Sequence, residues 1–307
     1  MRELLLSVDR VVPHTDADGL AAGALALRAR RQGADAAVLL GRGETPFGPH
    51  APLPPGSVAV LDWGVRRVER PGLLVDHHAP EAEPRPDQRV LSGYGEEPET
   101  ATAPLVLRLV PDQPAWLAAV GAFGDLGTAG LALPECAGAP RGAVRRLVPL
   151  VNAPRRLPDG PVRDALALLI QSESPAAALA DERIDLLAEA RAAWRAEFDR
   201  AVRTAPVVGD GVAFLRFSSP AQIHPLVATA WARRLAPRVV LAANDGYLPG
   251  RVNFAVRGGD GDLRALLRRA LPDAGGEFAH GHDRATGGSL PPEDFERLLE
   301  ALGLGRR

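Results

Sequence analysis

The sequence predicts an α/β protein of two lobes: a larger N-terminal domain built on a parallel sheet and a smaller α/β C-terminal domain, joined by a long helix. Its 307 residues are enough for two separate cores. In the first half, short runs rich in valine and leucine alternate with helical patterns, which is typical of a parallel sheet. After about residue 206, strand-like runs and helices alternate again. We expect domains at 1–155 and 206–307, with a helical connector at 156–205.

Composition and charge place the chain among ordinary soluble proteins, with 46% hydrophobic and 24% charged residues. A net charge of -2 excludes a strongly basic surface that binds nucleic acid over its whole area, but not a local arginine-lined groove. The single Cys136 cannot form an intramolecular disulfide, which fits a reducing cytoplasm. No apolar stretch approaches the roughly 20 residues of a membrane span. We therefore expect a cytoplasmic protein with no membrane partner.

The N-terminal half begins with a strand that leads into a helix at 20–31, which stops at Gly33. Segments 41–57 and 80–98 are rich in proline and glycine and are predicted to be loops. Further helices are expected at 100–110, 114–122 and 181–203. The last has an apolar stripe that predicts a packing face: Ile184, Leu187, Trp194, Phe198 and Val202.

The C-terminal half predicts strands at 212–217, 239–242 and 252–256, and helices at 226–235, 262–271 and 293–302. His224 stands at the start of the first of these helices, so we expect a packed or capping histidine. His50 lies in a proline-rich loop and is expected to be solvated.

Acidic and histidine residues follow the predicted strands of the first half. The clusters are His14-Thr15-Asp16-Ala17-Asp18-Gly19, Asp62 and Asp76-His77-His78, with a weaker fourth ending at Asp125. Because the carboxyl ends of parallel strands open on one rim of the sheet, we expect these side chains to converge. Carboxylates packed so closely repel one another unless protons or cations neutralise them. The number of Asp and His residues fits a pair of divalent metal ions better than a single ion.

The order of these clusters resembles the DHH phosphoesterases: H-x-D-x-D-G, a strand ending in Asp, Asp-His-His, then a lone Asp. The stretch Gly-His-Asp-Arg-Ala-Thr-Gly-Gly at 281–288 resembles the motif of that family's associated C-terminal domain, typically G-G-G-H-x-x-A-x-G. The resemblance covers nearly the whole chain. Ala279 and His280 depart from it, because the family usually has glycine there. The spacing of His14 and Asp16 is similar to that of the archaeal RecJ-like branch.

The resemblance implies a two-metal hydrolase with ions about 4 Å apart. The implied ligands of one ion are His14, Asp16 and Asp62, and those of the other are Asp18, Asp62, His77 and Asp125. Asp62 would bridge the two ions, while His14 could instead donate a hydrogen bond to a ligand. Asp76 would orient a histidine, and His78 would face the substrate phosphate. The implied catalytic residues are thus Asp62, Asp76 and His78.

The C-terminal domain would bind the substrate. The strand at 252–257 resembles the family strand that ends in a substrate-binding arginine, here Arg257. Gly281, Gly287 and Gly288 would let backbone N–H groups approach an anion. His282 matches the motif histidine and would contact a phosphate or terminal nucleotide.

Ligands with carboxylates in excess suit manganese or magnesium better than zinc, and the resemblance implies two Mn²⁺ per chain, with Mg²⁺ as the alternative. The expected function is a manganese-dependent phosphodiesterase or exonuclease acting on single-stranded nucleic acid or short oligonucleotides. One alternative is a nucleotide phosphatase or cyclic-dinucleotide phosphodiesterase; another is a non-catalytic replication or repair scaffold. The sequence leaves open whether the substrate is DNA or RNA, from which end it is cleaved and how long it is. It also leaves open the protein partners and whether the chain forms a homodimer.

Overall fold

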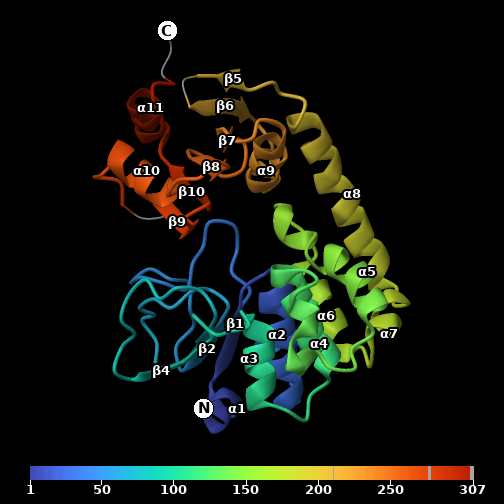
Figure 1. Ribbon diagram of the computed structural model, residues 1–307. Coiled ribbons are helices and arrows are strands. Elements are labelled where there is room, and N and C mark those ends of the chain that lie inside the picture. Colours follow the sequence, from blue (N-terminus) through green and yellow to red (C-terminus); the bar gives the residue numbers. More distant parts are fainter. Residues whose placement is uncertain (210, 276–277, 305–307) are drawn as a thin grey trace. The chain divides into compact units, whose positions relative to one another are not determined.

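The computed structural model describes residues 1–209, 211–275 and 278–304, and leaves out the side chains of 280–282 (Figure 1). The chain divides into two compact units. Unit 1 holds Met1–Arg155 and Asp159–Arg191, and unit 2 holds Arg156–Pro158 and Ala192–Arg307. One unit has a parallel sheet and the other a mixed sheet, which confirms the predicted fold class.

Unit 1 is built on a parallel sheet of four strands in sequential order. The strands are β1 (Arg10–Pro13), β2 (Val58–Leu61), β3 (Gly72–Asp76) and β4 (Gln88–Ser92). Strand β4 corrects the expected loop at 80–98. It lies at the edge of the sheet with Arg89 and Ser92 exposed, so it lacks the apolar run by which the other strands are recognised.

Helices cover only one face of this sheet (Figure 1). Val11, Leu61 and Val75 pack there in a large core with the helices. The residues that alternate with them, such as Val12 and Val60, pack instead against loop residues on the opposite face. The helices of unit 1 are α1 (Arg2–Ser7), α2 (Ala17–Ala29), α3 (Thr102–Leu109), α4 (Ala115–Leu126), α5 (Arg141–Val151), α6 (Val162–Gln171) and α7 (Pro175–Leu179).

Unit 2 has a six-stranded sheet in the order β5-β6-β7-β8-β10-β9. Its strands are β5 (Val207–Val208), β6 (Val212–Phe217), β7 (Val239–Asn244), β8 (Val252–Arg257), β9 (Phe278–His282) and β10 (Ala285–Leu290). Strands β6 and β7 pair in parallel, and the other described pairs are antiparallel. The predicted strands of this half are confirmed, and the glycine-rich motif forms β9 and β10.

The helices of unit 2 lie on both faces of its sheet. Helix α9 (His224–Arg234) packs on one face, and α10 (Leu263–Ala270) and α11 (Pro292–Ala301) share a core with the other. All three were predicted within about two residues. His224 is buried at the start of α9 and His50 is exposed, as expected.

Helix α8 (Arg183–Ala201) contributes residues to both units. Its apolar stripe is a packing face, as predicted: Leu187 is buried in the core of unit 1, and Trp194 and Phe198 pack against the α9 core of unit 2. Within the described part of the chain, no helix combines the length and the apolar character needed to cross a membrane.

Candidate metal centre

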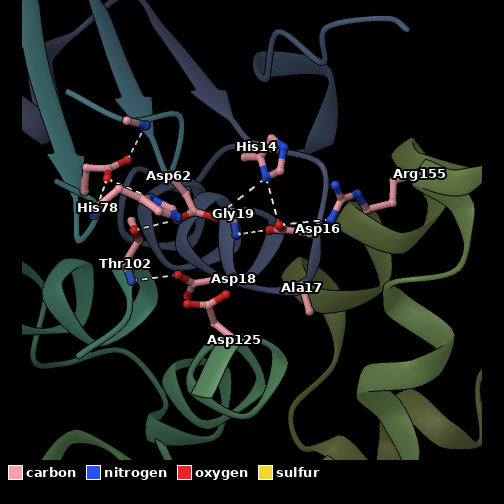
Figure 2. A network of polar contacts seen from close by, with 12 residues as sticks. His14, Asp16, Ala17, Asp18, Gly19, Asp62, His78, Thr102, Asp125 and Arg155 are labelled. Atoms are coloured by element: carbon pink, nitrogen blue, oxygen red, sulfur yellow. Dashed lines mark hydrogen bonds and ion pairs between the residues drawn. The ribbon is translucent and has the colours of Figure 1, made fainter. Parts of the chain in front are cut away.

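Strand register brings the predicted residues of unit 1 to one rim. Pro13 pairs with Leu61, and Leu61 with Val75, so β1, β2 and β3 end side by side. The next residues along the chain are His14 and Asp62, while Asp76 closes β3. Figure 2 shows the resulting cluster of carboxylate and imidazole side chains.

Two groups of donor atoms lie within this cluster and share Asp62. In each group, one ligand atom per residue lies within 4.8 Å of the others. The first group is His14, Asp16 and Asp62, and the second is Asp62, His77 and His78. Asp62 belongs to both groups, which is the position that a bridging carboxylate requires. The second group contains His78, which the sequence assigned to the substrate, and it does not contain Asp18 or Asp125, which the sequence assigned as ligands.

Asp62 is held in a strained and buried position. Its φ of 68° lies in the left-handed region that non-glycine residues avoid, and its side chain is buried. The Thr102 hydroxyl donates a hydrogen bond of 2.8 Å to Asp62 Oδ1 (Figure 2). Burial, followed by the negative charges of Asp18 and Asp16, raises the pKa of Asp62 well above its usual value.

Asp18 lies in the first turn of α2 and faces the start of α3. Its two carboxylate oxygens accept hydrogen bonds from the N–H groups of Thr102, at 2.7 Å, and Ala103, at 2.9 Å. These are the first residues of α3, where the helix dipole stabilises negative charge. Burial and the nearby Asp125 nevertheless raise the pKa of Asp18 to about 7.

Asp16 caps helix α2 and stays ionised. Its side chain accepts a hydrogen bond of 3.0 Å from the Gly19 N–H. The motif needs glycine at this position because a Cβ on residue 19 would lie only 2.4 Å from the His14 carbonyl oxygen. Burial opposes ionisation, but His14 Nδ1 at 2.9 Å and Arg155 Nη1 at 3.2 Å hold the pKa of Asp16 well below its usual value.

His77 and His78 have different environments. His77 Nε2 is buried and makes no hydrogen bond to the described residues; it lies 3.2 Å from Asp125 Oδ2 and 3.6 Å from Asp62 Oδ1. Burial lowers the pKa of His77, so its ring is neutral, as metal ligation requires. Although burial opposes protonation, the hydrogen bond between His78 Nδ1 and Asp76 Oδ1, at 2.9 Å, raises the pKa of His78 to about 9.

Asp76 therefore holds His78, while Asp125 extends the cluster from helix α4. Asp76 also accepts hydrogen bonds from the N–H groups of His78 and Gly64. Asp125 lies in the last turn of α4 and reaches His77. All eight residues predicted for this centre thus lie together.

The donor set fits divalent cations. Burial and mutual repulsion raise the pKa of two carboxyl groups, which means that their joint ionisation needs a compensating positive charge. The unpartnered nitrogen of His77 is a free ligand position. Oxygen donors in excess over imidazole suit Mn²⁺ or Mg²⁺.

Three residues that the sequence did not single out complete the cluster. Thr102 contacts Asp62 and Asp18, and Arg155 contacts Asp16. Asn152 Oδ1 accepts a hydrogen bond of 3.0 Å from the N–H of Ala17, beside Asp16. They come from helix ends remote in sequence from the motifs, so no local pattern indicates them.

The predicted substrate residues of the C-terminal motifs all belong to unit 2. Arg257 pairs with Ala285 of β10, which in turn pairs with His282 of β9, so backbone register places these positions in one row across three strands. Gly287 is two residues beyond Ala285, on the same face of β10, whereas Gly288 is on the other face. Gly281 pairs with Thr286. The predicted contact of the His282 side chain lies outside the described residues.

No protein-family model and no curated protein matches this chain. Several solved structures match the fold of this chain. A manganese-bound RecJ exonuclease has a TM-score of 0.59 and 20% identity, over 95% of this chain and 88% of that one. RecJ from Thermus thermophilus with Mn²⁺ has a TM-score of 0.64 and 20% identity, over 95% of this chain but only 51% of its own, so this chain spans about half of that protein.

A phosphodiesterase specific for pGpG, PggH from Vibrio cholerae, has a TM-score of 0.53 and 16% identity, over 95% of this chain and 97% of that one. The DHH domain of a member of a family of ribosomal proteins has a TM-score of 0.60 and 15% identity, over 98% of this chain and 87% of that one. The chain therefore has the two-domain α/β fold of the RecJ and DHH-domain structures.

Proposed function

We propose that this chain is a metal-dependent phosphoesterase that hydrolyses phosphodiester bonds in single-stranded nucleic acid or short oligonucleotides. The observation that carries the proposal is Asp62, a buried carboxylate with a raised pKa that two groups of donor atoms share. The similarity to RecJ structures that hold Mn²⁺ or Mg²⁺ supports it. We propose Mn²⁺ as the metal, with Mg²⁺ as the alternative.

His14, Asp16 and Asp62 would hold one ion, and Asp18, Asp62, His77 and Asp125 the other. Two bound divalent ions would acidify a water molecule and neutralise the phosphoryl oxygens. Two backbone N–H groups fix the orientation of the Asp18 carboxylate, whose remaining lone pairs would be available to an ion.

The residues around the ligands bind and orient the substrate. His78 is protonated at neutral pH and partly exposed, so it can donate a hydrogen bond to a phosphoryl oxygen. Asp76 keeps that ring charged and fixed. Arg155 balances the charge of Asp16 and keeps its carboxylate in place.

The second candidate function is hydrolysis of small nucleotide substrates, and the similarity to the pGpG-specific phosphodiesterase supports this function. A nucleotide phosphatase or cyclic-dinucleotide phosphodiesterase would share the metal centre and differ in what unit 2 accepts. A non-catalytic scaffold would not need the two adjacent groups of donor atoms that the rim provides.

The test is a panel of substrates with the purified chain. Bis-p-nitrophenyl phosphate, labelled single strands of DNA and RNA, pGpG, a cyclic dinucleotide and a nucleoside bisphosphate are each incubated with Mn²⁺, Mg²⁺ or EDTA, and the products are sized. We expect phosphodiester cleavage with Mn²⁺ and none with EDTA. Cleavage by a preparation that elemental analysis shows to be metal-free would contradict the proposal, as would the absence of any cleavage with Mn²⁺ bound.

A further inference from the structure

Trp63 follows the shared residue Asp62 in the chain, and its indole ring packs against the imidazole ring of His14. The two ring centroids are 4.8 Å apart and the ring planes are inclined by 78°, which is the edge-to-face arrangement that aromatic rings prefer. The indole Nε1 is buried and makes no hydrogen bond to the described residues. The ring is therefore held by packing, and one of its packing partners is a predicted metal ligand.

The backbone on both sides of Trp63 is in the left-handed region. The φ of Asp62 is 68° and that of Gly64 is 92°. A non-glycine residue keeps such a conformation only where its surroundings fix it. The Asp62 N–H donates a hydrogen bond of 3.0 Å to the carbonyl oxygen of Val75. The Gly64 N–H donates one of 2.5 Å to Asp76 Oδ2. The turn that presents Asp62 to the metal centre therefore fixes the backbone of Trp63 as well.

A core of apolar residues supports the indole ring from the face of the sheet that loops cover. Val12 of β1, Val60 of β2 and Leu74 of β3 belong to this core, and Trp63 packs against it. These three strands end at the rim where His14 lies. Trp63 thus connects the packed interior of unit 1 to one predicted ligand.

His14 has few other contacts that fix the orientation of its ring. Its Nδ1 lies 2.9 Å from Asp16 Oδ2 and 3.7 Å from Asp62 Oδ2, so this nitrogen faces the first group of donor atoms. The other nitrogen of a ligating histidine is usually held by a hydrogen bond, but Nε2 of His14 makes none to the described residues. Rotation about the Cβ–Cγ bond is a soft torsion in histidine and would turn Nδ1 away from both carboxylates.

We propose that Trp63 is a positioning residue of the metal centre. Its indole ring holds the imidazole of His14 in the orientation that points Nδ1 at Asp16 and Asp62, and so sets the affinity for the ion that these three residues would hold. The effect is confined to this ion, because the ring contact is with His14, which the other ion does not use. The ion rests on the proposed function, whereas the fixed orientation of the ring does not.

The first test is a calorimetric Mn²⁺ titration of the full chain. We expect Trp63→Leu to bind one of the two ions roughly tenfold or more weakly, because leucine leaves the imidazole free to rotate. Trp63→Phe keeps an aromatic ring beside His14 and should bind both ions as the wild type does. The matched control is Trp116→Leu. Trp116 is also buried in unit 1 with an unpartnered Nε1, but it lies in the first turn of α4, at the opposite end from Asp125. This variant should leave both affinities unchanged.

The variant His14→Ala shows whether Trp63 acts through His14. In that background, Trp63→Leu should leave the remaining Mn²⁺ affinity unchanged, since the ring that Trp63 positions is gone. A merely structural role of Trp63 would lower the remaining affinity further. That result would overturn the proposal, as would an unchanged affinity for both ions in a folded Trp63→Leu.

A second measurement needs neither a metal ion nor a leucine variant. In the wild type with EDTA, the His14 ring should give a single set of NMR resonances, with nuclear Overhauser effects to the indole protons of Trp63. The assignments come from His14→Gln and Trp63→Phe, and the exposed His50 is the control that should show no such effects. Two sets of His14 ring resonances, or no effect between the two rings, would overturn the proposal.

Hydrolysis by the wild type is measured separately with Mn²⁺. Its absence, with the titration and NMR results as expected, would contradict the proposed function and leave the role of Trp63 intact.

Discussion

At the scale of single residues, Asp62 has the least favourable environment of the metal centre. It is buried, has a left-handed backbone and lies among four other carboxylates that raise its pKa. Replacing it by asparagine should therefore stabilise the metal-free chain, with a rise in the thermal midpoint on the order of a few °C. The same change should abolish the stabilisation by Mn²⁺, because both groups of donor atoms lose their shared member.

Thermal unfolding at pH 7.5 with and without Mn²⁺ checks this expectation, together with metal content by elemental analysis. Asp159→Asn, at an exposed position, is the matched control and should behave as the wild type. An Asp62→Asn variant that still binds two Mn²⁺ per chain would show that the bridging role belongs to another residue.

We expect Thr102 to hold two of the predicted metal ligands in position without itself contacting the substrate. Its hydroxyl donates to Asp62 and its N–H to Asp18, so it ties two predicted ligands to the start of α3. Thr102→Val keeps the shape and removes the hydroxyl, and should weaken Mn²⁺ binding roughly tenfold or more, which is the usual cost of losing such a contact. Thr102→Ser should restore it. A calorimetric Mn²⁺ titration that gives equal affinities for Val and Ser would exclude this role.

At the scale of elements, the sequence predicts what local patterns encode. The strands before His14, Asp62 and Asp76 are buried on both faces, so their apolar runs are unbroken and easily recognised. Strand β4 was missed because only its first residue, Gln88, is buried, so the strand carries no apolar run. The hairpin of β9 and β10 was missed because glycine has low strand propensity, and only pairing with β8 keeps it extended.

The prediction of the site is likewise limited to residues that belong to a local sequence pattern. All eight residues assigned to the metal centre follow a strand or lie near a helix end with a recognisable motif, and the fold brings them together. Thr102, Asn152 and Arg155 reach the cluster only because α3 and the end of α5 pack beside α2. Contacts of that kind are tertiary, and a single sequence carries no periodic signal for them.

Helix α4 illustrates how closely elements approach at this site. A Cβ built on Gly121 would lie 2.3 Å from Asp18 Oδ1 and 2.5 Å from the Ala103 Cβ. Gly121→Ala should therefore force α4 away from α2 and α3, cost roughly 1–3 kcal/mol of unfolding free energy and weaken Mn²⁺ binding by displacing Asp18.

Gly142, in helix α5, supplies the control, since nothing lies within 4 Å of a Cβ at that position. Gly142→Ala should leave the unfolding free energy unchanged or slightly higher, because alanine is the better helix former. Urea unfolding of both variants is the measurement. Equal stability of the two would mean that α4 tolerates displacement and does not fix Asp18.

At the scale of the whole molecule, the proposed metal ligands and the proposed substrate residues are divided between two units. Every predicted metal ligand belongs to unit 1, and every predicted substrate residue except His78 belongs to unit 2. The two sets are joined in sequence by α8, whose packing face contributes to the cores of both units. A change in unit 2 should therefore alter which substrates are used without altering metal content.

Arg257→Ala tests this division. Because a hydrogen bond from a charged group contributes roughly 1.5–3 kcal/mol, we expect its loss to weaken the binding of oligonucleotide substrates about ten- to a hundredfold. Bis-p-nitrophenyl phosphate has no further nucleotide for unit 2 to hold, so its hydrolysis should fall much less. Metal content by elemental analysis should match the wild type. Steady-state kinetics on the two substrates gives the ratio of the losses. Equal losses would mean that unit 2 does not select the substrate, and that Arg257 serves the structure of unit 2 through its hydrogen bonds to the carbonyl oxygens of Val256 and Thr286.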